Sequence, residues 1–183
     1  MLYQIATFLL DLVGGLLTGA CLLRFYMQWQ RVSFANPLGR VVMALSDWLV
    51  LPLRRVLRAV RGWDVASLVA ALLLQLAQYG LLWLLMGAGV AWVWLLWLAL
   101  FGLLRVAITG LMGLLLVFAV LSWMPARAPL ADVIARLCAP LLRPLQRILP
   151  PLGGVDWSAL VALVLLQIAL IVLGHLQASV LLR

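Results

Sequence analysis

Few residues of this sequence could carry chemistry. Its 183 residues include no Lys, no Glu, one His and two Cys, and only 10% of them are charged. Enzymes commonly use His, Cys, Lys or paired carboxylates as acids, bases and nucleophiles. No phosphate-binding glycine loop, zinc-binding HExxH sequence or haem-binding CxxCH sequence occurs in the chain. We therefore expect no enzyme activity, no metal site and no cofactor.

The cysteines and the charges narrow the classes of protein further. Cys21 lies in an apolar stretch and Cys138 in a polar one, without a CxxC pair, so no disulfide framework is expected. All 13 cations are Arg and all five anions are Asp, which gives a net charge of +8. The arginines stand beside apolar stretches, as is typical of contact with anionic lipid headgroups. Direct contact with nucleic acid is not expected.

Apolar residues make up 68% of the chain, which is more than the interior of a soluble domain of this size can enclose. A membrane-spanning helix needs about 20 mostly apolar residues. The sequence predicts an all-α membrane protein with four main spans, at Ile5–Trp29, Val65–Met86, Leu96–Trp123 and Trp157–Gln177. It leaves open whether residues 91–104 add a short or re-entrant helix, because the three tryptophans there favour the bilayer–water boundary.

Two arginine-rich blocks lie between the predicted spans. The block between spans one and two holds six Arg, and the block between spans three and four holds four. Arginines near spans stay on the cytoplasmic side of a membrane. We therefore expect a multi-pass protein of the bacterial inner membrane, with both basic blocks in the cytoplasm and both termini in the periplasm.

The chain divides into two similar units offset by 92 residues. The matching pairs include Pro37 and Pro129, Pro52 and Pro144, Arg55 and Arg147, Gly62 and Gly154, Asp64 and Asp156, and Gln75 and Gln167. The match predicts two tandem repeats, 1–91 and 92–183, each built as transmembrane helix, cytoplasmic amphipathic helices and transmembrane helix. Because each repeat has an even number of spans, the repeats should be parallel.

Prolines and arginines suggest how each basic block folds. Pro52 is expected to end a first helix, and the residues after it predict an interfacial helix with apolar side chains on one face and arginines on the other. The second block follows the same plan around Pro144. The side chains expected on anionic headgroups are Arg54, Arg55, Arg58, Arg61, Arg143 and Arg147. The expected helix caps are Asn36, Asp64 and Asp156.

Six short runs of the sequence carry a resemblance to a known family. They are Leu22–Trp29, Phe34–Pro37, Pro52–Leu57, Ser122–Trp123, Pro140–Pro144 and Leu149–Ser158. They resemble the two repeats of the YggT family, also called YlmG-like, over nearly the whole chain. The first unit has Arg58–Arg61 where the family pattern has Pro-Pro and Gly, so the two loops need not be equivalent.

The resemblance implies a small inner-membrane protein without an established enzyme activity. Relatives in other lineages are linked to cell division, to nucleoid organisation in chloroplasts and to assembly of a photosynthetic cytochrome complex. Some members are associated with osmotic or ion stress. None of these roles follows from the residues themselves.

Charged and amide side chains inside the predicted spans are the candidate functional residues, since such groups are costly in lipid. Asp11 and Arg105 lie at nearly equivalent depths, because 105 − 92 = 13, and we expect them to pair. The pair would act as a gate or proton site, or as a structural ion pair that fixes the register of the repeats. Gln75 and Gln167 would line a polar path or form interhelical hydrogen bonds.

Four small residues and Arg24 are the remaining candidate residues in the predicted spans. Closely spaced small side chains predict tight helix packing in lipid, and here they are Gly15, Gly19, Thr109 and Gly113. Arg24 lies near the end of the first span, and its long side chain is expected to reach the cytoplasmic boundary.

Two functions of different classes follow. The favoured hypothesis is a non-enzymatic scaffold or assembly factor whose basic amphipathic helices bind anionic lipid and recruit a protein partner. The alternative is a channel or transporter component in ion or osmotic homeostasis. The spans hold fewer polar residues than a pathway usually needs, which favours the scaffold. Whether the chain forms a homo-oligomer is left open.

Overall fold

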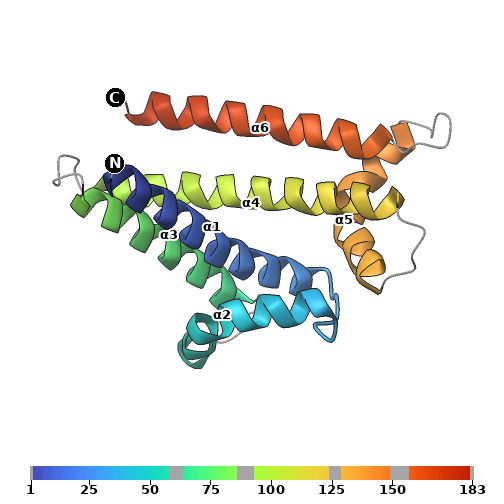
Figure 1. Cartoon of the computed structure of the whole chain (residues 1–183), viewed down its shortest axis with the longest axis horizontal. Coiled ribbons are helices and arrows are strands. Elements are labelled where there is room, and N and C mark those ends of the chain that lie inside the picture. The colour runs from blue at the N-terminus through green and yellow to red at the C-terminus, as the bar shows by residue number, and fades with distance from the viewer. Residues whose placement is uncertain (1, 58–63, 86–92, 124–128, 149–156, 182–183) are drawn as a thin grey trace.

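The structure is a computed structural model that describes residues 2–57, 64–85, 93–123, 129–148 and 157–181. Six helices hold nearly all of these residues, and no strand occurs among them. In chain order they are α1 (Leu2–Trp29), α2 (Pro37–Val56), α3 (Val65–Leu85), α4 (Val93–Trp123), α5 (Pro129–Ile148) and α6 (Trp157–Leu181), as Figure 1 shows.

The predicted fold class is confirmed. Helices α1, α3, α4 and α6 are each long and apolar enough to cross a membrane. Many of their large apolar side chains are exposed on the outside of the bundle, as expected where lipid takes the place of a protein core. Both chain termini lie at one end of this bundle, which we call the terminal end, and α5 crosses the other, which we call the α5 end (Figure 1).

Residues 93–104 form no separate helix. Helix α4 begins at Val93 and continues without interruption to Trp123, so the open question about residues 91–104 is settled for the described part of that segment. Trp94 and Trp97, which favoured a loop on the membrane surface, belong to the first turns of this helix. With 31 residues, α4 is about 46 Å long at 1.5 Å per residue, long enough to place these rings near the terminal end.

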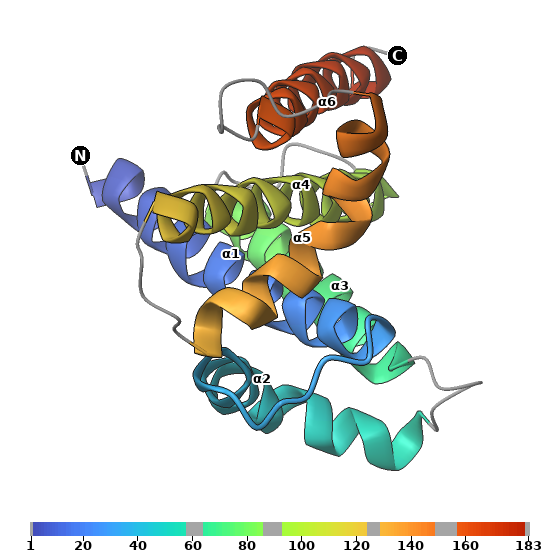
Figure 2. The ribbon, with the colours of Figure 1, turned by 90° about the vertical axis from the view of Figure 1, so that its right-hand side faces the viewer.

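The expectation that Pro52 ends a helix is wrong. Helix α2 runs through Pro52 to Val56, and α5 runs through two prolines, Pro140 and Pro144. A proline removes one backbone hydrogen bond and bends a helix, but packing on both sides can keep the helix continuous. Val50, just before Pro52, is fully buried, and Leu53, just after it, packs against the same cluster. Figures 1 and 2 show α2 changing direction toward its C-terminal end.

The helices form two groups that meet along α4. Helix α1 packs against α2 and α3, and α4 packs against α1, α3, α5 and α6. Helix α6 lies at the far side of α4 from α2 and is also contacted by α5 (Figure 2). Helices α2 and α5 begin and end 92 residues apart, and α3 and α6 begin 92 residues apart. The division into two tandem repeats stays a prediction.

An apolar cluster joins the two groups at the α5 end. Met27 of α1, Val32 in the following loop, Val42 of α2 and Leu137 of α5 are all buried in it. The Tyr26 hydroxyl donates a hydrogen bond of 2.7 Å to the backbone carbonyl of Leu137. The positions of α2 and α5 are therefore fixed relative to α1 by both apolar and polar contacts.

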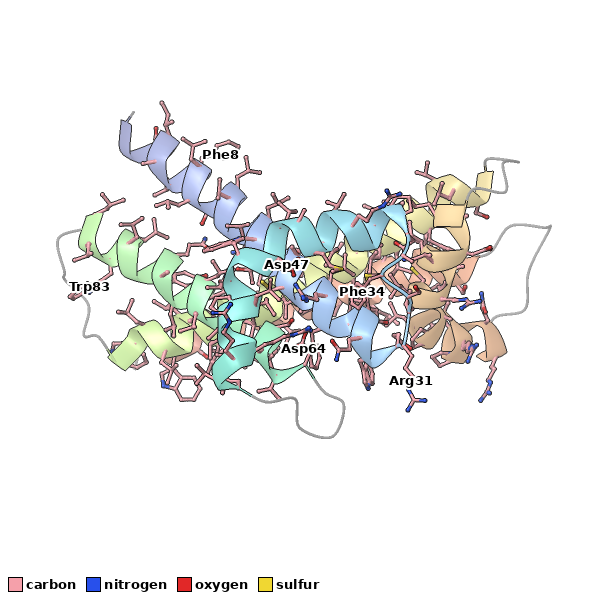
Figure 3. The ribbon with its side chains drawn as sticks, turned by 90° about the horizontal axis from the view of Figure 1, so that it is seen from below. Phe8, Arg31, Phe34, Asp47, Asp64 and Trp83 are labelled. Atoms are coloured by element: carbon pink, nitrogen blue, oxygen red, sulfur yellow. The ribbon has the colours of Figure 1, made fainter. Side chains whose placement is uncertain are left out.

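The end of α1 directs the chain into this cluster. Arg31 has φ of 53°, the left-handed conformation usually taken by glycine after a helix. The Val32 N–H bonds the Met27 carbonyl at 2.9 Å and the Arg31 N–H bonds the Gln28 carbonyl at 3.0 Å, which is a Schellman motif. Figure 3 shows the Arg31 side chain pointing away from the helices while Phe34 lies beside them.

Candidate functional site

A buried arginine lies where α1, α2 and α3 meet. Arg24 is 3% exposed. Its Nη1 donates to the Ser46 hydroxyl at 2.8 Å and to Oδ1 of Asp47 at 2.6 Å, and its Nε lies 3.8 Å from Oδ2 of Asp64. One guanidinium of α1 therefore binds two carboxylates, one on α2 and one directly before α3.

Asp64 is equally buried and has a second arginine as its partner. Arg54 approaches both carboxylate oxygens, with Nη2 at 2.5 Å from Oδ2 and Nε at 3.3 Å from Oδ1. The Ser67 hydroxyl donates to Oδ2 at 2.5 Å. Burial alone would raise the pKa of the Asp64 carboxyl, but the bonds and charge of Arg54 and the bonds from Ser67 hold it below its ordinary value. Asp64 is therefore ionised at neutral pH.

We call this group of side chains the ionic cluster. It comprises Arg24, Ser46, Asp47, Arg54, Asp64 and Ser67, and its two positive and two negative charges balance. Asp64 is buried, whereas the side chain of Asp47 is 34% exposed, and Figure 3 labels both carboxylates near the middle of the structure. Neither of the two cavities described among the resolved side chains is lined by its members. Its arrangement suits a clamp between helices better than a binding or catalytic site.

Two arginines of the ionic cluster have other partners than the sequence predicted. The sequence predicted that Arg24 extends toward lipid headgroups. Its guanidinium is instead buried between the helices, where Asp47 and Asp64 bind it. Arg54, expected on lipid headgroups, gives its Nη2 to Asp64 and to Oε1 of Gln28, the latter at 3.2 Å. Arg55, Arg143 and Arg147 are exposed, whereas Arg58 and Arg61 lie outside the described residues.

Two of the expected helix caps can be followed. The Asn36 side chain accepts a hydrogen bond from the Gly39 N–H at 2.7 Å. Asp64 directly precedes α3, and the backbone N–H of Ser67 bonds to it, so the same carboxylate both caps a helix and binds arginine. Asp156 lies outside the described residues.

A second polar network lies nearer the terminal end, between α1 and α3. The Gln78 amide donates to Oδ1 of Asp11 at 2.8 Å, and the Gln75 amide donates to Oε1 of Gln78 at 3.1 Å and to the Thr18 hydroxyl at 3.2 Å. Gln75 and Thr18 are buried, whereas Asp11 is exposed. Asp11 and Gln75 were among the polar residues singled out in the predicted spans, whereas Gln78 and Thr18 were not.

Two glycines make room for these amides. A Cβ atom at Gly14 of α1 would collide with the Gln78 amide, and one at Gly102 of α4 would collide with the Gln75 amide and the Tyr79 ring. The sequence analysis missed both glycines. Their positions in the sequence could have indicated this role. Gly14 lies three residues after Asp11, and Gly102 lies three residues before Arg105, so each glycine is about one helical turn from a charged residue in an apolar helix.

The small residues that were expected to pack closely against other helices show few such contacts among the described residues. A Cβ at Gly19 would make ordinary contact with Val106 of α4 at 3.8 Å, and one at Gly15 or Gly113 would meet nothing within 4 Å among the described atoms. The Thr109 hydroxyl bonds the backbone carbonyls of its own helix at Arg105 and Val106. Of this set, Gly19 alone supports close approach of two helices within the described chain.

Arg105 and Gln167 lie at one cavity, although the charges of Arg105 and Asp11 both act on Tyr79 of α3. The cavity has a volume of about 320 Å³ and lies between α4 and α6, with Thr109 and Gln177 as further polar walls. Among the described residues, no ion pair joins Arg105 to Asp11. The expected intramembrane pairs are thus split between two places, with Asp11 and Gln75 on the α1–α3 side and Arg105 and Gln167 on the α4–α6 side.

An apolar layer separates the Asp11–Gln75 network from the ionic cluster. Cys21, Ala70 and Ala71 are buried there, and Gln75 lies eight residues from Ser67 on α3, about 12 Å along the helix. Polar groups therefore follow the α1–α3 contact from both ends, but no hydrogen bond between described side chains joins the two groups.

Helices α2 and α5 expose different chemistry at matching positions. On α5 the exposed face carries Asp132, Arg136, Pro140, Arg143 and Arg147, which we call the α5 stripe. The positions 92 residues earlier are also exposed on α2, where they are Arg40, Ala44, Trp48, Leu51 and Arg55. Helix α5 thus presents a basic face, and α2 presents a largely apolar face with an arginine at each end.

The described side chains offer no metal site. No group of three or more His, Cys, Asp or Glu residues among them is placed to hold a metal ion. Burial raises the pKa of the Cys138 thiol on α5 to about 11, so at neutral pH this side chain is a protonated thiol and a poor nucleophile.

Comparison with known proteins identifies relatives over nearly the whole chain. The model of the CCB3/YggT family matches residues 3–85 and 97–177. The uncharacterized protein YggT of Escherichia coli (strain K12) is 38% identical over 166 residues, which cover 88% of this chain and 85% of that protein. The uncharacterized protein PA0392 of Pseudomonas aeruginosa is 35% identical over 181 residues, with 94% and 90% covered.

A third relative, the uncharacterized protein in the proC 3′ region of Vibrio alginolyticus, is 31% identical over 173 residues, covering 93% of this chain and 94% of that protein. No solved structure matches the chain. The match of the family model to both groups of helices shows that this chain belongs to the CCB3/YggT family.

Proposed function

We propose that the protein is a non-enzymatic scaffold or assembly factor of the bacterial inner membrane. In this proposal α2 and α5 lie on the cytoplasmic side, bind anionic headgroups and recruit a protein partner. The two tandem repeats, with both termini in the periplasm, supply two such helices in one chain. The proposal follows from chemistry at the surface of the protein rather than from a reacting centre.

The observation that carries the proposal is the α5 stripe on a firmly held helix. Arg136, Arg143 and Arg147 are exposed on one face of α5, and each cation near an anionic surface contributes about 1 kcal/mol to binding. The opposite face is anchored, since Leu137 is fully buried and accepts the Tyr26 hydrogen bond. A basic surface on a rigid support keeps its geometry when it binds, which lowers the entropy lost on association.

The exposed face of α2 supports the same reading in a different way. Trp48 and Leu51 are 58% and 50% exposed and lie between Arg40 and Arg55. A tryptophan and a leucine flanked by arginines suit the boundary between acyl chains and headgroups. The two helices would then contact the membrane in complementary ways, α2 through apolar burial and α5 through charge.

A second candidate function is conduction of protons or ions along α1 and α3. The hydrogen-bonded series Asp11, Gln78, Gln75 and Thr18 favours it. The apolar layer of Cys21, Ala70 and Ala71 opposes it, because this layer interrupts the series before it reaches the ionic cluster. A pathway needs polar groups or water throughout the span, so the scaffold is the better-supported function.

The scaffold proposal is tested by lipid retention. The full-length protein is purified in mild detergent with phosphatidylglycerol, and the number of lipids retained per chain is measured by native mass spectrometry. We expect the double substitution Arg143→Gln and Arg147→Gln to reduce retention severalfold. Phosphatidylcholine, which has no net charge, should show little retention by either protein.

Asp132→Asn is the matched control, since it changes a charge of opposite sign on the same exposed face. It should leave phosphatidylglycerol retention equal or higher. Equal retention by the wild-type protein and the double variant would show that the α5 stripe is not a lipid surface and would remove the main support for this function.

A further inference from the structure

Arg105 is a cation within one of the long apolar helices, where its charge acts on Tyr79 of α3, as the charge of Asp11 also does. Among the described residues, no side chain forms a hydrogen bond or an ion pair with its guanidinium. It lies twelve residues after the start of α4, about 18 Å along the helix, and it is exposed. An unpaired charge at this depth is costly in lipid, so an anionic or polar partner from outside the described chain is expected.

The cavity beside Arg105 is suited to receive a helix. Its polar walls come from Arg105, Thr109, Gln167 and Gln177, and Gly174 also lines it. A Cβ at Gly174 would meet nothing within 4 Å, so the surface of α6 is open at this point. Small residues such as Gly and Thr permit close approach of a neighbouring helix in a membrane.

The complementary charge stands elsewhere on the same molecule. Asp11 is exposed and accepts a hydrogen bond from Gln78, but no cation among the described residues lies within ion-pair distance of it. Figure 3 shows the N-terminal part of α1 standing clear of the other helices, with Phe8 pointing away from them. Phe8 and Leu12, on either side of Asp11, are 64% and 56% exposed.

The two charges lie at matching depths. Helices α1 and α4 both run from the terminal end to the α5 end (Figure 1), and positions 11 and 105 differ by two residues after the offset of 92 is subtracted. Two residues correspond to about 3 Å along a helix, well within the reach of an arginine side chain. A neighbouring copy in the same orientation would therefore present its Asp11 at the level of this Arg105.

We propose that the cavity between α4 and α6 accepts the N-terminal part of α1 from a second copy of this chain, and that Asp11 of the partner subunit pairs with Arg105. The contact joins two different surfaces of the protein. Such a contact either closes into a ring of subunits or continues as a row. It places the expected Asp11–Arg105 pair between subunits, and it is independent of the proposed scaffold function.

The proposal is tested by disulfide trapping in the membrane between two differently tagged full-length copies. One copy carries Gly15→Cys, where a Cβ meets nothing within 4 Å, and the other carries Thr109→Cys. Each thiol lies one turn beyond its charge toward the α5 end, so the two thiols are at similar depth when Asp11 faces Arg105, and both charges are retained. We expect a disulfide between the two tags. The matched control replaces Thr109→Cys by Leu73→Cys, an exposed position on α3 that does not line the cavity, and should give little product.

Charge variants then test the pairing itself. Arg105→Asp in the second copy should lower the yield of the mixed disulfide about fivefold, the order expected for one interhelical polar contact. Adding Asp11→Arg to the first copy should restore the yield, because the two charges are then exchanged between copies. Circular dichroism and membrane insertion of each variant should match the wild type.

Three results would overturn the proposal. One is a yield no higher than the Leu73→Cys control, and another is a yield that does not depend on the charges at positions 11 and 105. The third is a disulfide that forms within single copies carrying both Gly15→Cys and Thr109→Cys and not between tags, which would place the pair inside one chain. Loss of retained phosphatidylglycerol on Arg105→Gln, without any mixed disulfide, would assign the cavity to a lipid phosphate.

Discussion

The first half of the chain, α1 to α3, and the second half, α4 to α6, follow the same helical plan with different chemistry. In the first half, α1 and α2 meet through the ionic cluster. At five of the six positions 92 residues later, the second half has apolar or uncharged residues, and the exception is Asp156, which corresponds to Asp64. The corresponding pairs are Arg24 and Leu116, Ser46 and Cys138, Asp47 and Ala139, Arg54 and Gln146, and Ser67 and Ala159.

The second half replaces this polar contact by apolar packing. Ile134, Cys138 and Leu142 of α5 are buried against Leu115 of α4 and Ala159 of α6. Its arginines lie instead on the outer face of α5, where the first half has Ala44 and Leu51. A similar order of helices can therefore be held together by buried charges or by buried apolar side chains. In the second half the interior is apolar, and the arginines of α5 lie at the surface, where they can contact the membrane or a partner.

The largest expected effect comes from removing the central cation of the ionic cluster. Arg24→Leu installs the residue of the second half and leaves Asp47 and part of Asp64 without a positive partner. Loss of one member of a buried ion pair costs about 3–5 kcal/mol of unfolding free energy. The measurement is unfolding of the purified protein in mixed micelles, followed by circular dichroism.

Leu116→Met is the matched control at the corresponding position of α4. Leu116 is exposed to lipid, so the change should shift the unfolding free energy by less than about 0.5 kcal/mol. If Arg24→Leu were as mild as this control, the first half would not be held by its charges and the comparison between the halves would fail.

Removing both partners sharpens the comparison. The double variant Arg24→Leu, Asp47→Ala converts both positions of the first half to the residues found 92 positions later. It should be more stable than the sum of the two single losses predicts, with a coupling of about 1–3 kcal/mol. Additive losses in this double-mutant cycle would show that the 2.6 Å contact between Arg24 and Asp47 contributes no interaction energy.

The two equivalent glutamines should respond unequally. Gln75 is buried and bonds Thr18 and Gln78, whereas Gln167 is exposed beside the cavity. Gln75→Leu should cost about 0.6–2 kcal/mol, the range for interhelical hydrogen bonds in membranes, and Gln167→Leu should cost close to nothing in the single chain. Equal losses would mean that the halves use these positions in the same way.

The smallest expected effect is on the pH dependence of the unfolding free energy, because the Asp64 carboxyl becomes protonated only near the acidic limit of the measurable pH range. The pKa of Asp64 is lowered in the folded protein, so its contribution to stability is complete above the unfolded value of about 3.9 and is lost as the pH falls through the folded value. Asp64→Asn should flatten the decrease in unfolding free energy below about pH 4. Asp132→Asn, an exposed control, should keep the wild-type slope, and identical slopes for both variants would contradict this role of Asp64.

The sequence predicted the spans well because length and apolar content determine them almost alone. It misplaced Arg24 and the end of α2 because both depend on tertiary contacts. Packing of Val50 and Leu53 keeps α2 continuous at Pro52, and carboxylates from two other helices enclose Arg24. The spacing of Cys21, Arg24 and Gln28 along one face of α1 was the available signal for a polar helix contact.

The intramembrane charges were found from the sequence, but their partners were not. Depth along a helix can be read from residue number, whereas the direction in which a side chain points depends on how each helix is rotated. Asp11 therefore has the depth of Arg105, yet its hydrogen bond is to Gln78 on α3. Gly14 and Gly102 were missed for the same reason, since their value lies in what packs against them.

The most direct test of the account is ion and proton flux through the purified full-length protein in liposomes that contain phosphatidylglycerol. The account treats the polar groups of the first half as structural contacts and predicts no flux above that of empty liposomes for protein shown to be folded and inserted. Flux that is present in the wild type and disappears in Asp11→Asn or Gln75→Leu would contradict it, and would make the α1–α3 contact a pathway.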